Sequence, residues 1–111
     1  MENIIFKEND GELTASLCGE LDHGLASSVR GRIDAAIEEK RPKTAVLDIS
    51  GVSFMDSSGL GLIMGRYALC RRLGVGFRLR GADVRAKKII DSAGLCSVIT
   101  IEEDAKGAIR K

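Results

Sequence analysis

The stretch 44-TAVLDISGVSFMDSSGLGLIMGRY-67 decides the fold, because in it an apolar strand-like run passes directly into an apolar helical run. Residues 44–50 favour β-structure and carry few charges, which is typical of a strand covered on both faces. A helix is predicted over residues 57–73. We therefore expect residues 44–50 to form the centre of a sheet, with residues 55–61 as the loop at the carboxyl end of this strand.

Upstream of this stretch, two short strands and one amphipathic helix are predicted. Residues 3–7 and 13–19 read as strands separated by ENDGE, whose Asp10-Gly11 pair supplies the positive φ angles of a tight hairpin. Apolar residues then recur at helical spacing until Pro42 ends the helix. They are Leu25, Val29, Ile33, Ala36 and Ile37. The sheet is therefore expected to begin with an antiparallel strand.

Downstream, the sequence predicts a strand over residues 75–79, a helix over 83–93 closed by Gly94, and a strand at 97-SVITI-101. Ala105, Ala108 and Ile109 favour a short final helix. Strands that alternate with helices imply parallel crossover connections. The predicted fold class is α/β: one domain over residues 1–111, with a mixed, mostly parallel sheet, an antiparallel N-terminal strand and flanking helices.

Composition narrows the class of protein. The chain has 111 residues, is 44% apolar and 30% charged, and carries a formal net charge of +1, as in an ordinary soluble globular protein. No basic-then-apolar signal begins it, and no apolar run approaches the ~20 residues of a membrane span. We expect a cytoplasmic protein without a membrane segment. Five basic residues form a candidate patch without interleaved aromatic residues, so a solvated face is favoured over a nucleic-acid site. They are Arg78, Arg80, Arg85, Lys87 and Lys88.

Three cysteines stand far apart, each among apolar neighbours: Cys18, Cys70 and Cys96. Their odd number and wide spacing predict buried, reduced thiols rather than disulfides. With a single histidine in the chain, a metal site is not expected. No sequence pattern points to a cofactor either.

Two polar loops, 19-GELDHG-24 and 55-MDSSGLG-61, leave the carboxyl ends of successive strands and are expected to be neighbours. Asp56 is predicted to cap the following helix, and Gly59 to let backbone or a partner approach closely. Ser57 and Ser58 have three interpretations: first-turn helix residues, a nucleophile served by His23, or an acceptor that another enzyme modifies. Neither serine has the flanking glycines of a nucleophile elbow, which argues against an enzyme.

The helix after this loop carries apolar residues on both sides. A helical wheel places six of them on the core side: Leu60, Ile63, Met64, Tyr67, Ala68 and Cys70. Leu62, Leu69 and Leu73 fall on the opposite side, beside Gly61 and Gly65. Coverage of this second side by a neighbouring helix is favoured over an exposed docking patch.

Four motifs resemble one protein family over essentially the whole chain. GELDH, SFMDSSGLG and GRY, together with DSAGL at 91–95, stand in the order found in the bacterial anti-sigma factor antagonists of the STAS fold. The likeness is nearest to the sporulation sigma-F type. The serine loop is the most specific of the four motifs.

The resemblance implies a regulatory binding protein. Such antagonists bind an anti-sigma factor that is also an ATP-dependent serine kinase, and thereby free the sigma factor. The kinase inactivates the antagonist by phosphorylating the serine after the loop aspartate, which is Ser57 here, and a PP2C-type phosphatase reverses this step. The helical wheel does not choose between Ser57 and Ser58, so the choice rests on the family.

The implied partner contacts lie on the two loops and the start of the following helix. They are Asp22, His23, Asp56, Ser57, Ser58, Gly59, Leu60, Gly61 and Leu62. The free chain is expected to be a monomer. The alternative function is that of a STAS scaffold or sensor module within a signalling assembly or a transporter.

Overall fold

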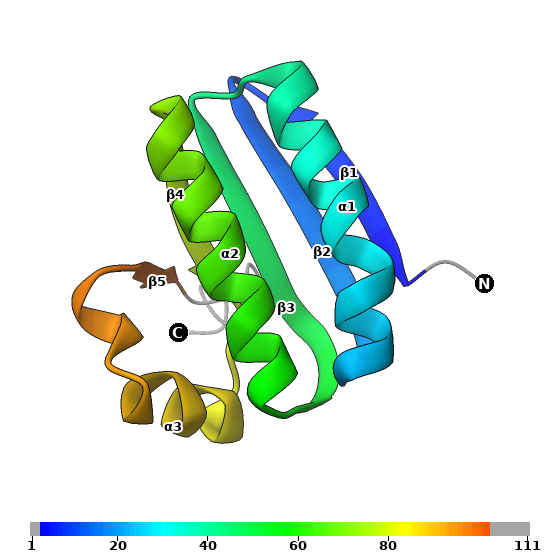
Figure 1. Cartoon of the computed structure of the whole chain (residues 1–111), viewed down its shortest axis with the longest axis vertical. Coiled ribbons are helices and arrows are strands. Elements are labelled where there is room, and N and C mark those ends of the chain that lie inside the picture. Colours follow the sequence, from blue (N-terminus) through cyan, green and yellow to red (C-terminus); the bar gives the residue numbers. More distant parts are fainter. Residues whose placement is uncertain (1–2, 103–111) are drawn as a thin grey trace.

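The computed structural model describes residues 3–102, which form a five-stranded sheet with helices between its parallel strands (Figure 1). The strands are β1 (Ile4–Asn9), β2 (Glu12–Leu21), β3 (Thr44–Met55), β4 (Gly76–Arg80) and β5 (Thr100–Glu102). The helices are α1 (His23–Lys40), α2 (Ser57–Leu73), α3 (Val84–Ser92) and the short 3-10 helix η1 (Leu95–Ser97).

The sheet has the order β1-β2-β3-β4-β5, so β3 lies at its centre as predicted. β1 pairs antiparallel with β2, and all other pairs are parallel, which confirms the predicted fold class. The strand predicted at 97–101 begins only at Thr100, because η1 ends at Ser97 and the N–H groups of Val98 and Ile99 still donate to the Leu95 carbonyl. The predicted helical residues Ala105, Ala108 and Ile109 lie outside the described residues.

The hairpin between β1 and β2 has the predicted geometry. Asp10 and Gly11 adopt φ angles of 51° and 82°, the left-handed values that a two-residue hairpin turn requires. The Gly11 carbonyl also accepts hydrogen bonds from the backbone N–H groups of Lys43, at 2.8 Å, and Thr44, at 3.3 Å. The turn is thereby joined to the start of the central strand, at the edge opposite the serine loop.

β2 and β3 run further than the sequence predicts. Their pairing extends from Glu12 opposite Thr44 to Leu21 opposite Met55, with register shifts after Ser16 and after Gly19. At Gly51 an added Cβ would lie 2.9 Å from the Leu17 carbonyl oxygen, so only glycine fits there without a shift. The extension carries both strands to the same edge of the sheet.

The hydrophobic core lies between one face of the sheet and the helices α1 and α2, which run side by side across that face (Figure 1). From α1, the periodic residues Val29, Ile33 and Ile37 are buried as predicted. From the sheet, Leu17, Leu47 and Leu79 are at most 2% exposed. Alternation along each strand points these residues inward and their neighbours to the other face.

The predicted wheel of α2 is partly wrong. Met64 is 49% exposed and Ala68 is exposed, although both were placed on the core side. Leu62 and Leu69, placed on the opposite side, are 3% and 4% exposed. The reason is that α2 packs against the sheet and against α1 at once, so its buried face is turned toward α1. Coverage by a neighbouring helix is therefore confirmed.

The three cysteines are free thiols, but only Cys70 is buried. Burial raises its pKa to about 11. Cys18 and Cys96 are exposed, contrary to the prediction. In β2 the core position belongs to the preceding Leu17, and in η1 it belongs to Leu95, so the cysteine that follows each leucine faces away from the core.

The other face of the sheet carries an ion-pair network rather than a basic patch. Arg78 and Arg80 both contact Glu102, at 2.8 Å and 3.0 Å, and both reach Glu12, at 3.9 Å and 3.5 Å. Burial raises the pKa of Glu102, but hydrogen bonds from Arg80 and Arg78 outweigh it, so the net pKa lies below its usual value. Two of the five residues of the candidate basic patch are therefore paired with acidic side chains.

Candidate functional site

The two polar loops are neighbours, as predicted. Leu21 ends β2 opposite Met55 at the end of β3, and the Asp56 N–H donates to the Leu21 carbonyl at 3.4 Å. The helices that follow, α1 and α2, therefore begin side by side at the lower end of the molecule in Figure 1. Two helix N-termini, each with positive dipole character, share one edge of the sheet.

An aspartate caps each of these helices. Asp22 has an extended backbone, and its Oδ1 accepts from the Leu25 N–H at 3.0 Å. Asp56 is also extended, and its Oδ1 accepts from the Ser58 N–H at 2.8 Å. The predicted capping role of Asp56 is confirmed. Both carboxylates satisfy N–H groups that a helix start leaves unpaired.

Ser57 and Ser58 differ in exposure. Ser57 is the first residue of α2 and is exposed, whereas Ser58 is half-buried. Within residues 3–102, neither hydroxyl has a hydrogen-bond partner. Ser58 faces a groove of about 280 Å³ between α1 and α2, which is also lined by His23, Arg30 and Arg66.

The nucleophile interpretation gains no support from this geometry. His23 is exposed at the start of α1 and lines the same groove as Ser58. In the described chain it makes no hydrogen bond to either serine. A nucleophilic serine needs a base within hydrogen-bond reach, and this arrangement does not supply one. An exposed, unpaired hydroxyl is instead accessible to the active site of another protein.

The glycines and leucines at the start of α2 divide into a surface layer and a supporting layer. Gly61 is exposed and Leu60 is half-buried, whereas Gly59 is buried and Leu62 is 3% exposed. A Cβ on Gly59 would lie 2.3 Å from Met55 Cγ, so this glycine makes room for a core side chain rather than for the backbone or the partner that was predicted. The structure brings the predicted contact residues to one edge, with Gly59 and Leu62 lying beneath its surface.

An ion pair behind the site was not predicted. Arg66 of α2 lies 2.7 Å from Asp34 of α1, measured from Nε to Oδ1, and the two side chains are 9% and 33% exposed. Burial lowers the pKa of Arg66 and raises that of Asp34, and the attraction between the two opposes both shifts. The pair links the two helices behind their N-termini. The available signal was an arginine set between the apolar pairs Leu62-Ile63 and Leu69-Cys70.

The described residues offer neither a metal cluster nor a membrane-spanning helix. Over residues 3–102, no group of three or more His, Cys, Asp or Glu side chains is placed to hold a metal ion. In the same range, no helix is both long enough and apolar enough to cross a membrane. Polar groups of the two loops converge with those of the groove between α1 and α2.

Comparisons with known proteins agree with the fold. A family model described as the STAS domain matches residues 3–108, and the chain belongs to this family. An anti-sigma F factor antagonist of Paenibacillus polymyxa is 33% identical over 106 residues, which cover 96% of this chain and 91% of the relative. The resemblance to the anti-sigma factor antagonists is thereby confirmed.

Two solved structures of the anti-sigma factor antagonist SpoIIAA are similar over most of both chains. The unphosphorylated form has a TM-score of 0.78 and is 26% identical, covering 96% of this chain and 92% of the other. The phosphorylated form, described as a Bacillus cell fate determinant, has a TM-score of 0.73 and is 26% identical, covering 96% of each chain. Relatives of this kind are regulatory proteins rather than enzymes.

Proposed function

We propose that this chain, in its unphosphorylated form, binds an anti-sigma factor that is also a serine kinase, and so releases the sigma factor. Phosphorylation of Ser57 by that kinase ends the binding. The observation that carries this proposal is the exposed Ser57 hydroxyl, which stands directly after Asp56 at the start of α2. A PP2C-type phosphatase would restore the binding form, and ATP or ADP would be bound by the kinase.

The fold tolerates a phosphate at Ser57. A phosphate adds about −1.5 to −2 charges, and a helix N-terminus favours an anion by roughly 0.3–1 kcal/mol. Because Ser57 is exposed, the added group meets solvent rather than the core. The switch therefore requires no refolding of the free chain.

An interface does not tolerate the same phosphate. On binding, it would lose water beside the carboxylate of Asp56, with that of Asp22 at the neighbouring helix start. An uncompensated buried charge costs several kcal/mol, and about 3 kcal/mol weakens binding roughly a hundredfold. Charge at one hydroxyl is thus sufficient to release a partner.

The exposed contact surface supports this arrangement. His23, Ser57 and Gly61 are exposed along the shared edge, and Asp22 and Asp56 are half-exposed between them. Gly59 and Leu62 hold α2 in place beneath this surface rather than contact the partner directly. The solved structure of a phosphorylated relative supports the proposal, because that phosphorylated protein has a similar fold.

The test is incubation with the cognate kinase and ATP, followed by peptide mass mapping. We expect phosphate on Ser57, none on Ser57→Ala, and normal phosphorylation of the control Ser58→Ala. Ser57→Ala should bind the kinase constitutively, and Ser57→Asp about a hundredfold more weakly. Phosphate found only on Ser58, or equal affinity of the phosphorylated and free forms, contradicts the proposal. Self-association without kinase binding favours the scaffold alternative.

A further inference from the structure

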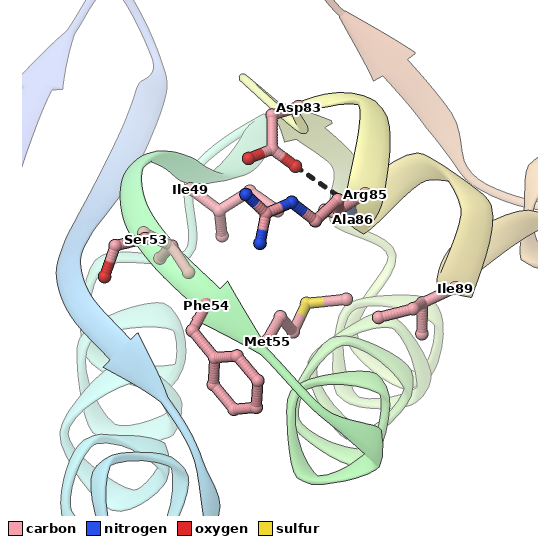
Figure 2. Close-up of a pocket in the computed structure, with 9 residues that line it drawn as sticks. Ile49, Ser53, Phe54, Met55, Asp83, Arg85, Ala86 and Ile89 are labelled. Carbon is pink, nitrogen blue, oxygen red and sulfur yellow. Dashed lines mark hydrogen bonds between the residues drawn. The ribbon is translucent and has the colours of Figure 1, made fainter.

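A second cavity lies between β3 and α3, and the proposed switch does not use it. It is formed by the C-terminal half of β3 and the start of α3 (Figure 2), and it has a volume of about 210 Å³. Its lining comes from two segments about 30 positions apart in the chain, residues 49–55 and residues 83–89.

The walls of this cavity are mostly apolar. Ile49, Met55 and Ala86 are 2%, 6% and 7% exposed, and Ile89 is half-buried. Figure 2 shows Met55 and Ile89 pointing toward one another across the cavity, with Phe54 at its margin. Phe54 is 48% exposed, which is unusual for a large aromatic side chain. A cavity of about 150 Å³ holds a benzene ring, so this one has room for one ring or one branched aliphatic group.

One charged group at the mouth has no partner among residues 3–102. Arg85 is exposed, and Figure 2 shows its side chain extending from α3 across the mouth toward β3. Within residues 3–102 its guanidinium makes no ion pair. The acid in the lining, Asp83, caps α3 by accepting from the Ala86 N–H at 2.9 Å, so part of its charge is compensated by the helix start.

We infer that this cavity is a binding site for a small apolar carboxylate about the size of benzoate. The ring or branched group occupies the apolar walls, and the carboxylate pairs with Arg85, whose planar guanidinium matches a carboxylate in two hydrogen bonds. An apolar cleft with one oriented polar group is the usual form of a small-molecule site. Because Met55 and Phe54 immediately precede Asp56, a bound ligand lies next to the serine loop.

The test is a titration of the ¹⁵N-labelled full chain with benzoate, followed by NMR. We expect saturable shifts at the amides of Val52, Phe54, Ala86 and Ile89, with a dissociation constant of roughly 1–10 mM, as for a ligand of this size. Arg85→Gln, at an exposed position, should weaken binding at least tenfold. The matched control Lys88→Gln, on the same helix but outside the lining, should change binding less than twofold.

Two analogues test the charge. Benzamide should bind at least tenfold more weakly than benzoate, and benzylamine should bind more weakly still. Equal binding of benzamide, tighter binding of benzylamine, or unchanged affinity in Arg85→Gln overturns the assignment of a carboxylate site. Absence of saturable shifts at the lining amides overturns the site itself. The titration uses the free chain alone, so its outcome is independent of the phosphorylation switch.

Discussion

The starts of α1 and α2 are two versions of one local structure. Each follows a strand that ends at the same edge of the sheet, and each is capped by an extended aspartate. α1 then begins with His23-Gly24, whereas α2 begins with Ser57-Ser58. The Asp22 carboxylate bonds the N–H three residues on, and the Asp56 carboxylate bonds the N–H two residues on.

The difference between the two helix starts distinguishes residues that the fold requires from the residue that the proposed switch requires. Capping is common to both and accounts for both aspartates without any function. Of these two helices, only α2 has a hydroxyl side chain at its first position, and that residue is exposed. In the proposed function, the switch therefore depends on the side chain at the first position of α2, because the capped backbone is common to both helix starts.

The largest loss of stability is expected from breaking the ion pair that links α1 and α2. Asp34→Ala leaves the Arg66 guanidinium buried without its counter-charge, and we expect a loss of about 3 kcal/mol in the free energy of unfolding, measured by urea denaturation. The control Glu38→Ala, one turn further along α1, should cost less than about 0.5 kcal/mol. The double variant Asp34→Leu/Arg66→Met should recover most of the loss. Equal costs for Asp34→Ala and Glu38→Ala would contradict this role.

A smaller loss of stability is expected from adding a methyl group beneath the start of α2, but not at the start of α1. At Gly59 an added Cβ would lie 2.3 Å from Met55 Cγ and 3.2 Å from Leu21 Cδ2, so Gly59→Ala should cost about 2 kcal/mol. At Gly24 the nearest atom, Asp22 Oδ1, is 3.6 Å away, an ordinary contact. Gly24→Ala should therefore be neutral or stabilise by up to about 1 kcal/mol, because alanine is the better helix former. Thermal denaturation of both variants checks the contrast, and a tolerated Gly59→Ala would refute it.

The smallest loss of stability should be equal at the two helix starts. Asp22→Ala and Asp56→Ala each remove one capping carboxylate, and each should cost about 1 kcal/mol in denaturant unfolding. The matched Asn variants keep a capping oxygen and should lose only a few tenths of that amount. A cost at one helix start and none at the other would show that the two caps are not equivalent.

Local signals in the sequence predicted most of the fold. Period-3.6 spacing placed α1 and its buried residues, and the Asp10-Gly11 pair placed the hairpin. The rule that loops meet at the carboxyl ends of parallel strands placed Asp22 beside Asp56. These features depend on neighbours in the chain or on a general rule of topology, so one sequence was sufficient to predict them.

The sequence did not predict features that depend on contacts between residues far apart in the chain. The buried face of α2 was misplaced because Arg66 is covered through its pairing with Asp34 of another helix. β3 was cut short at Ser50 because Gly51 and Ser53 favour strands weakly, and pairing with β2 overrides that preference. The apolar cavity joins Met55 to Ile89, and no local pattern relates those two positions.

The order of strands in the sheet is also their order along the chain. Every strand after the first therefore finds its pairing partner already synthesised when it leaves the ribosome. Because no strand must wait for a later segment, the sheet can assemble stepwise during translation, with short loop closures and few unpaired edges exposed. The edge that carries Ser57 would then be complete before the last third of the chain is made.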